Sequence, residues 1–159
     1  MKIALLFNDR NCREQTRDRL LADKRTAVQE YPTAASALGD LVSKPFDLIV
    51  IDAVTYPGLG AEDREINDLA ALIPGTQYNA KVLYWQVALR VIHHIYSEAS
   101  CNRDSPVAVR VSRALPSSIG MGDVLSEEGV RKDLERLPRV TMLKATRPDD
   151  LARALLLMI

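Results

Sequence analysis

The feature that most constrains the fold is the segment Phe46–Asp52, in which four consecutive apolar residues, Leu48–Ile51, lead directly into an acidic residue. A strand with one solvated face alternates apolar and polar residues, whereas a strand buried on both faces reads as a continuous apolar run. Strands of the second kind belong to parallel sheets that carry helices on both sides. The segment therefore predicts a central strand of an α/β domain.

The rest of the chain alternates between strand-like and helix-like segments. Short apolar or β-branched runs form the first set, and apolar residues at helical spacing form the second. The expected strands are Lys2–Phe7, an edge-like Thr26–Tyr31, Phe46–Asp52, Pro106–Ser112 and Val140–Lys144, and the expected helices are Cys12–Ala22, Ala34–Val42, Ser126–Leu137 and Pro148–Met158. Because βαβ crossovers are right-handed, this order predicts a flavodoxin-like, doubly wound five-stranded parallel sheet of (βα)5 type.

The stretch between the third and fourth strands is longer than a single helix requires. Glu62–Ile73 has an apolar stripe typical of a helix. Lys81–Tyr96 also has apolar residues at helical spacing, although its first part, Val82–Trp85, is strand-prone by composition. Because the length of the second segment favours a helix, we expect an enlarged helical region between these two strands.

Size and charge narrow the class of protein. With 159 residues, 47% of them apolar, the chain suits one domain spanning residues 1–159. Its 21 basic and 21 acidic side chains cancel, which argues against binding to nucleic acid or to an anionic membrane surface. The apolar amino terminus stops at Asn8, too early for a signal peptide or a membrane span, so we expect a cytoplasmic protein.

The cysteines and histidines do not have the spacing of a metal site. Cys12 and Cys101 are far apart and are expected to be reduced thiols. His93 and His94 are adjacent in an expected helix, so their side chains point about 100° apart. They are expected to be surface or packed histidines rather than ligands of one metal ion.

Chemically capable residues follow the ends of the expected strands. In a doubly wound sheet, ligands and reacting groups collect outside the carboxyl ends of the strands, at the point where the strand order reverses. Any functional site is therefore expected among the residues that end strands, namely Asn8, Asp9, Asp52, Ser112, Arg113 and Lys144.

This arrangement resembles the receiver domain of two-component response regulators over most of the chain. The segment Lys44–Asp52 looks like the third strand of that family with its phosphate-accepting aspartate, and Pro57-Gly58 looks like the loop that follows it. Pro106–Ser112 is similar to the fourth strand with its terminal hydroxyl residue. Lys144, seven residues before Leu151, matches the spacing of the family's lysine and last helix.

The resemblance implies a role for each of these residues. A carboxylate accepts a phosphoryl group when a metal ion and an ammonium group relieve the charge repulsion. Asp52 would be the acceptor, with Lys144 as the charge partner and Ser112 as the switch hydroxyl. Mg²⁺ would be the cofactor, and its ligands would be Asp52, Asp9, Asn8 and the carbonyl of Ala53.

The resemblance also implies partners. A histidine kinase or a phosphotransfer protein would supply the phosphoryl group, and a downstream effector protein would read the state of the pocket. Enzymatic activity would be limited at most to self-phosphorylation from a phosphodonor and to autodephosphorylation. Leu156, Leu157 and Ile159 add apolar surface to the last helix, which suggests a homodimer or a partner surface.

Two alternatives remain open from the sequence. The acidic pair of the family falls on Asn8-Asp9, or on Phe7-Asn8 in a second register, and Ala145 stands where the family has proline. These departures leave open, as an alternative to the phosphorelay receiver, a degenerate pseudo-receiver that acts as a phosphorylation-independent interaction module through the enlarged region 62–100. The other alternative is a flavodoxin-like protein that binds a small molecule or a nucleotide, although the loop Asn8–Cys12 has no glycine to wrap a phosphate.

Overall fold

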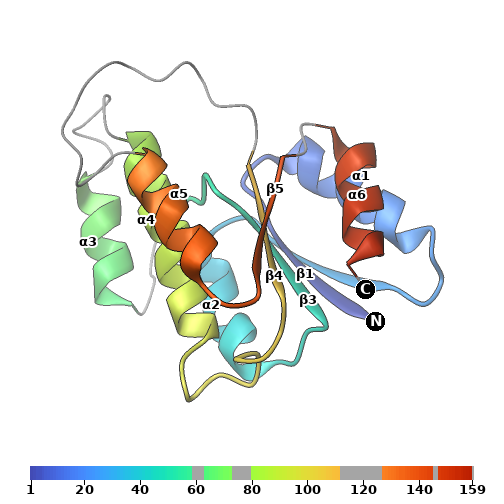
Figure 1. The fold of residues 1–159 in the computed structure, drawn as a ribbon, viewed down its shortest axis with the longest axis horizontal. Coiled ribbons are helices and arrows are strands. Elements are labelled where there is room, and N and C mark those ends of the chain that lie inside the picture. Colours follow the sequence, from blue (N-terminus) through green and yellow to red (C-terminus); the bar gives the residue numbers. More distant parts are fainter. Residues whose placement is uncertain (59–62, 73–79, 112–126, 145–146, 159) are drawn as a thin grey trace.

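The computed structural model describes residues 1–58, 63–72, 80–111, 127–144 and 147–158. Its centre is a five-stranded parallel sheet of order β2-β1-β3-β4-β5 (Figure 1). The strands are β1 (Lys2–Leu6), β2 (Ala27–Tyr31), β3 (Leu48–Asp52), β4 (Val107–Arg110) and β5 (Val140–Leu143). The predicted α/β fold, the five strands and the edge position of Thr26–Tyr31 are therefore confirmed.

The strand order reverses between β1 and β3. The chain first pairs β2 with one side of β1 and then crosses back to pair β3 with the other side, so that Ile3 lies opposite both Val28 and Leu48. This is the topological switch point of the sheet. The residues that follow β1 and β3 consequently lie side by side at the carboxyl edge.

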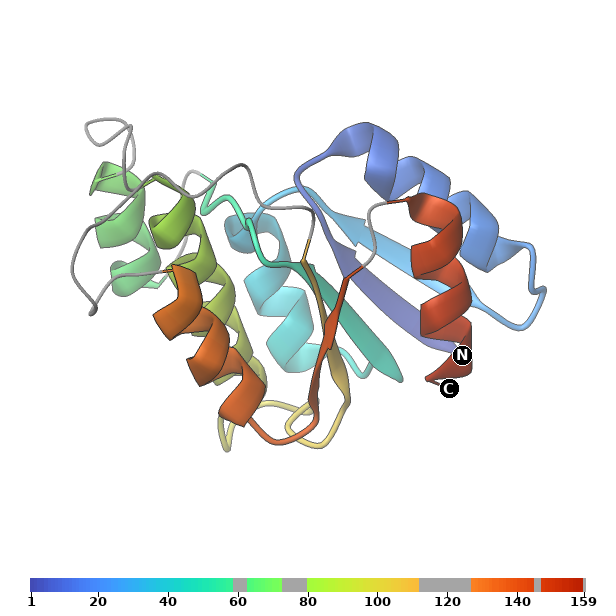
Figure 2. The same ribbon diagram turned by 45° about the horizontal axis from the view of Figure 1, so that its top comes forward.

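Helices cover both faces of the sheet (Figures 1 and 2). On one face, α1 (Arg10–Leu21) packs against α6 (Pro148–Leu157). On the other face, α4 (Ala80–Ile95) lies between α2 (Ala34–Ser43) and α5 (Glu127–Arg136). The remaining helix, α3 (Arg64–Leu72), lies on the outer side of α4.

The third crossover differs from a simple (βα)5 pattern because both α3 and α4 lie between β3 and β4. The helical interpretation of Lys81–Tyr96 is confirmed by α4, and the strand alternative for Val82–Trp85 is wrong. Trp85 is buried in the core beneath the helix. Burial of one helical stripe over the whole segment thus outweighs the β-propensity of its first residues.

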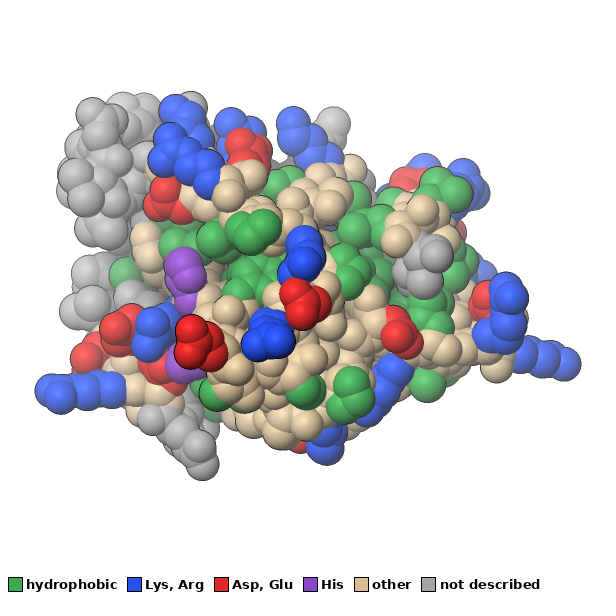
Figure 3. Space-filling model, turned by 60° about the horizontal axis from the view of Figure 1, so that its bottom comes forward, with side chains coloured by type: hydrophobic (Ala, Val, Ile, Leu, Met, Phe, Trp, Pro, Cys, Tyr) green, Lys and Arg blue, Asp and Glu red, His purple; other side chains and the backbone are tan. Residues whose placement is uncertain are grey.

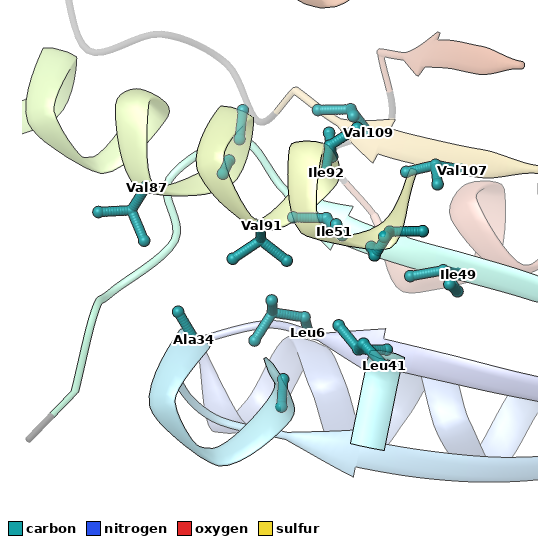
Figure 4. Packing of buried hydrophobic residues seen from close by; sticks show 14 of the residues in the cluster. Leu6, Ala34, Leu41, Ile49, Ile51, Val87, Val91, Ile92, Val107 and Val109 are labelled. Atoms are coloured by element: carbon teal, nitrogen blue, oxygen red, sulfur yellow. The ribbon is translucent and has the colours of Figure 1, made fainter. Parts of the chain in front are cut away.

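Alternation along the strands divides the core into two apolar layers. Ile3, Leu5 and Phe7 face α1 and α6, whereas Ala4 and Leu6 face the helices on the other side. Figure 4 shows the second layer, in which side chains of α4 and α2 meet those of the strands. Since both faces of β3 are fully buried, its continuous apolar sequence is explained.

Charged side chains of both signs are interspersed on the surface drawn in Figure 3, with hydrophobic side chains between them. Within the described part of the chain, no helix is both long enough and apolar enough to cross a membrane.

Candidate functional site

A buried salt bridge lies at the carboxyl edge of the sheet. Asp52 ends β3 and Arg110 ends β4, and the two residues are direct partners in the parallel ladder. Both point toward α1, because they continue the alternation of Leu48, Val50 and Ala108. Arg110 Nη1 lies 2.6 Å from Asp52 Oδ2, and the side chains are only 8% and 7% exposed.

The surroundings of this pair are largely apolar. The Arg110 guanidinium lies 5.6 Å from the centre of the Phe7 ring, a cation–π contact. Burial raises the pKa of the Asp52 carboxyl, and the Arg110 guanidinium and the Val54 amide, which donates to Asp52 Oδ1 at 3.1 Å, oppose that shift. Both oxygens of Asp52 are therefore already hydrogen-bonded within the protein.

Asn8 joins the end of β1 to the loop that follows β3. Its side-chain amide nitrogen donates to the carbonyl of Val54, and its side-chain oxygen accepts a hydrogen bond of 2.9 Å from the Tyr56 amide. One neutral side chain thus bridges the two segments that meet at the switch point of the sheet. The amide group of Asn8 thus acts as both donor and acceptor in this bridge.

The loop after β3 is further fixed by α2. The Ala34 amide donates to the carbonyl of Tyr56, and the Ala35 amide donates to the carbonyl of Pro57, both at 2.8 Å. These two amides belong to the first turn of α2, whose N–H groups have no partner within the helix. Gly58 completes the contact with a φ of +77°, and a Cβ atom there would lie 2.6 Å from Thr33 Oγ1.

Asp9, a predicted magnesium ligand, caps α1. Its Oδ1 accepts a hydrogen bond of 3.0 Å from the Cys12 amide, and its carbonyl accepts one of 2.9 Å from Arg13. Asp9 lies near enough to Asp52 for its charge to raise the pKa of that carboxyl. Among the described residues, no three His, Cys, Asp or Glu side chains are grouped as a metal site would require.

The other predicted site residues are distributed around this edge. Lys144 is exposed just after β5, and β4 separates β5 from β3. Ala53 is buried next to Asp52, and its amide donates to the carbonyl of Arg110 at 2.9 Å. Ser112 and Arg113 lie outside the described residues. The structure thus brings Asn8, Asp9 and Asp52 to one edge of the sheet.

Arg110 is the site residue that sequence reasoning missed. Its signal was present, because an arginine within the apolar segment Pro106–Val111 must either leave the sheet or find a buried counter-charge. Asp52 ends the adjacent strand and is the acid in register with it.

Comparison with known proteins adds no relative. The chain matches no protein-family model, and a search of curated proteins finds no match.

Proposed function

We propose that the chain is a receiver-like interaction module that works without phosphoryl transfer, because an internal salt bridge already engages the carboxylate of Asp52. The observation that carries this proposal is the buried contact between Arg110 and Asp52. Asn8 adds to it by tying the loop after β3 to β1.

The chemical requirements of a phosphoryl acceptor support the proposal, because the surroundings of Asp52 do not meet them. A phosphoryl acceptor needs an accessible carboxylate oxygen and a cation that offsets the incoming negative charge. In this chain a guanidinium already neutralises Asp52, and release of Arg110 would leave the buried Asp52 carboxylate without that counter-charge. The pair therefore resists both metal binding and attack on a phosphodonor.

The competing function is that of a phosphorelay receiver with Asp52 as acceptor. Its support is the position of Asp52 at the end of β3, beside the end of β1 and close to Asp9. In that function Arg110 would have to release Asp52 when Mg²⁺ binds.

One experiment separates the two functions. The full chain and Asp52→Asn are incubated with Mg²⁺ and acetyl phosphate, and their intact masses are measured alongside an active receiver protein. We expect no added phosphoryl group on either variant. A gain on the wild type that Asp52→Asn lacks would establish the phosphorelay function instead.

A Mg²⁺ titration followed by amide NMR provides an independent readout. No saturable shift is expected for the amides of Asn8, Asp9 and Ala53 at millimolar Mg²⁺. Saturable shifts confined to these three amides would favour a metal site and contradict the proposal.

A further inference from the structure

Helix α3 is attached to the molecule through α4 rather than through the sheet. Figures 1 and 2 show it on the outer side of α4, as a separate layer. Ile66 is its fully buried apolar anchor and belongs to the same cluster as Val87 and Val91 of α4. Because α3 contacts α4 rather than the sheet, it could open locally while the sheet stays folded.

A polar cluster reinforces this attachment. Asp63 precedes α3, and its Oδ1 accepts a hydrogen bond of 3.0 Å from the Ile66 amide. Its Oδ2 is shared by two residues one turn apart on α4: Arg90, whose Nη2 lies 3.2 Å away, and His94 through Nε2. Arg90 also pairs with Glu65 of α3, with Nε and Oε2 3.2 Å apart.

Within this cluster, His94 bonds the carboxylate of Asp63 through Nε2, and histidine is the residue type whose charge change lies nearest neutral pH. Burial disfavours ionisation of Asp63, but the Ile66 amide, His94 and Arg90 outweigh it and lower the pKa of Asp63 to about 2. Asp63 is therefore ionised across the range in which a histidine titrates, and Arg90 remains charged throughout. His94 is 28% exposed, so water can supply its proton.

The other charged groups around His94 have fixed charges or lie apart from the contact. Glu65 and Arg90 carry opposite charges and form an ion pair with each other. His93, the neighbour of His94, is exposed. Within the described part of the chain, the hydrogen bonds and ion pairs of Asp63 and His94 involve neither α2 nor α5, the other helices packed on α4. His94 also lies in the last turn of α4, where the helix dipole favours a positive charge.

We propose that α3 is a detachable helix, and that protonation of His94 tightens its docking on α4. The contact of a neutral imidazole with Asp63 is a hydrogen bond to one charged group, whereas an imidazolium adds a second charge to the same contact. Acid then strengthens docking, and a rise in pH weakens it. The contact between α3 and α4 does not involve the buried Asp52–Arg110 pair, so the inference does not depend on the proposed function.

Native-state hydrogen exchange tests this on the full chain. Exchange of the α3 amides is measured at about pH 5.5 and about pH 8, corrected for intrinsic rates, with the β1 and β3 amides as the reference for global unfolding. We expect the α3 amides to exchange through local opening, and their opening constant to be about fivefold larger at the higher pH. His94→Gln should keep a neutral donor and abolish the pH dependence.

His93→Gln is the matched control, because it removes the neighbouring exposed histidine and should leave the pH dependence intact. Two results would overturn the proposal. One is an α3 opening constant equal to that of β1 and β3, which would mean that α3 does not detach by itself. The other is a pH dependence that is absent from the wild type or unchanged in His94→Gln.

Discussion

Arg110 Nη1 and Asp52 Oδ2 are separated by 2.6 Å, the same distance that separates Arg19 Nε from Asp149 Oδ1 on the surface. The first pair is almost completely buried, whereas the side chains of the second are 64% and 62% exposed. The two pairs have similar short contacts and opposite environments. A comparison of the two pairs therefore shows how burial changes the contribution of an arginine–carboxylate contact to the free energy of unfolding.

Arg110→Met should destabilise the fold by about 3–5 kcal/mol, because it leaves the Asp52 carboxylate buried without its partner. Arg19→Met should change the free energy of unfolding by less than about 1 kcal/mol, since water screens the exposed pair. Urea denaturation at neutral pH measures both. Equal effects of the two substitutions would mean that the Asp52 pair is not desolvated in solution.

A double substitution tests whether the stability lost in Arg110→Met comes from the buried, unpartnered carboxylate of Asp52. Asp52→Leu combined with Arg110→Met replaces the ion pair with apolar groups of similar size. The double variant should regain most of the stability that Arg110→Met loses, because no charge remains in the apolar environment. A double variant as unstable as Arg110→Met would show instead that the loss comes from packing around Arg110.

The sheet could be predicted from the sequence because its strands carry strong local signals. The continuous run Leu48–Ile51 identifies a strand buried on both faces, and that strand lies third of five in the sheet order. The separation of α3 from the sheet could not be predicted in this way. An amphipathic pattern shows that one face of a helix is buried, but does not say whether a strand or another helix buries it.

The candidate site was predicted only in part, for a similar reason. Asn8, Asp9 and Asp52 could be placed at one edge, because the carboxyl ends of parallel strands meet there. The partner of Asp52 depends on the register between β3 and β4, which pairs it with Arg110. Local periodicity contains no information on register between strands that are distant in sequence.

Asn102 links the loop that precedes β4 to the loop that precedes β3, at the amino edge of the sheet. Its fully buried amide accepts from the Phe46 amide at 2.8 Å and donates to the carbonyls of Leu41 and Lys44 at 2.7 and 2.6 Å. Asn102→Ala should cost about 3 kcal/mol or more, since several buried backbone groups lose their partner. Thermal or urea unfolding measures the loss.

The exposed Asn11 in α1 provides the control for that substitution. Asn11→Ala should alter the free energy of unfolding by no more than about 0.5 kcal/mol. If Asn102→Ala were as mild as Asn11→Ala, water would have to replace the lost amide, and the loops would be less tightly joined than the contacts imply.

Two glycines provide opposite predictions for the same substitution. Gly58→Ala should destabilise by more than about 1 kcal/mol, because φ is +77° and the added Cβ would collide with Thr33. Gly39→Ala should stabilise by about 0.5–1 kcal/mol, because Gly39 lies within α2 and nothing lies within 4 Å of the added atom. Effects of the same sign, measured by urea denaturation, would contradict the geometry of the loop after β3.

Acid should weaken the contribution of Asp63 to stability. Its pKa is about 2 in the folded protein and about 4 in an unfolded chain, so the carboxylate binds its proton more weakly when folded. The stabilisation is fully present above about pH 4 and is lost as the pH falls through about 2. Asp63→Asn retains a side chain that can cap α3 but removes the charge that meets Arg90 and His94.

This variant should therefore cost about 1–2 kcal/mol at neutral pH, and the difference from wild type should shrink as the pH falls from about 4 toward about 2. Asp68→Asn, at an exposed position within α3, should show a small difference at every pH. Urea unfolding of the three proteins between about pH 7 and about pH 3 measures this. A penalty for Asp63→Asn that stays constant over that range would place the role of Asp63 in packing rather than in charge, because only a charge contribution disappears when the carboxylate is protonated.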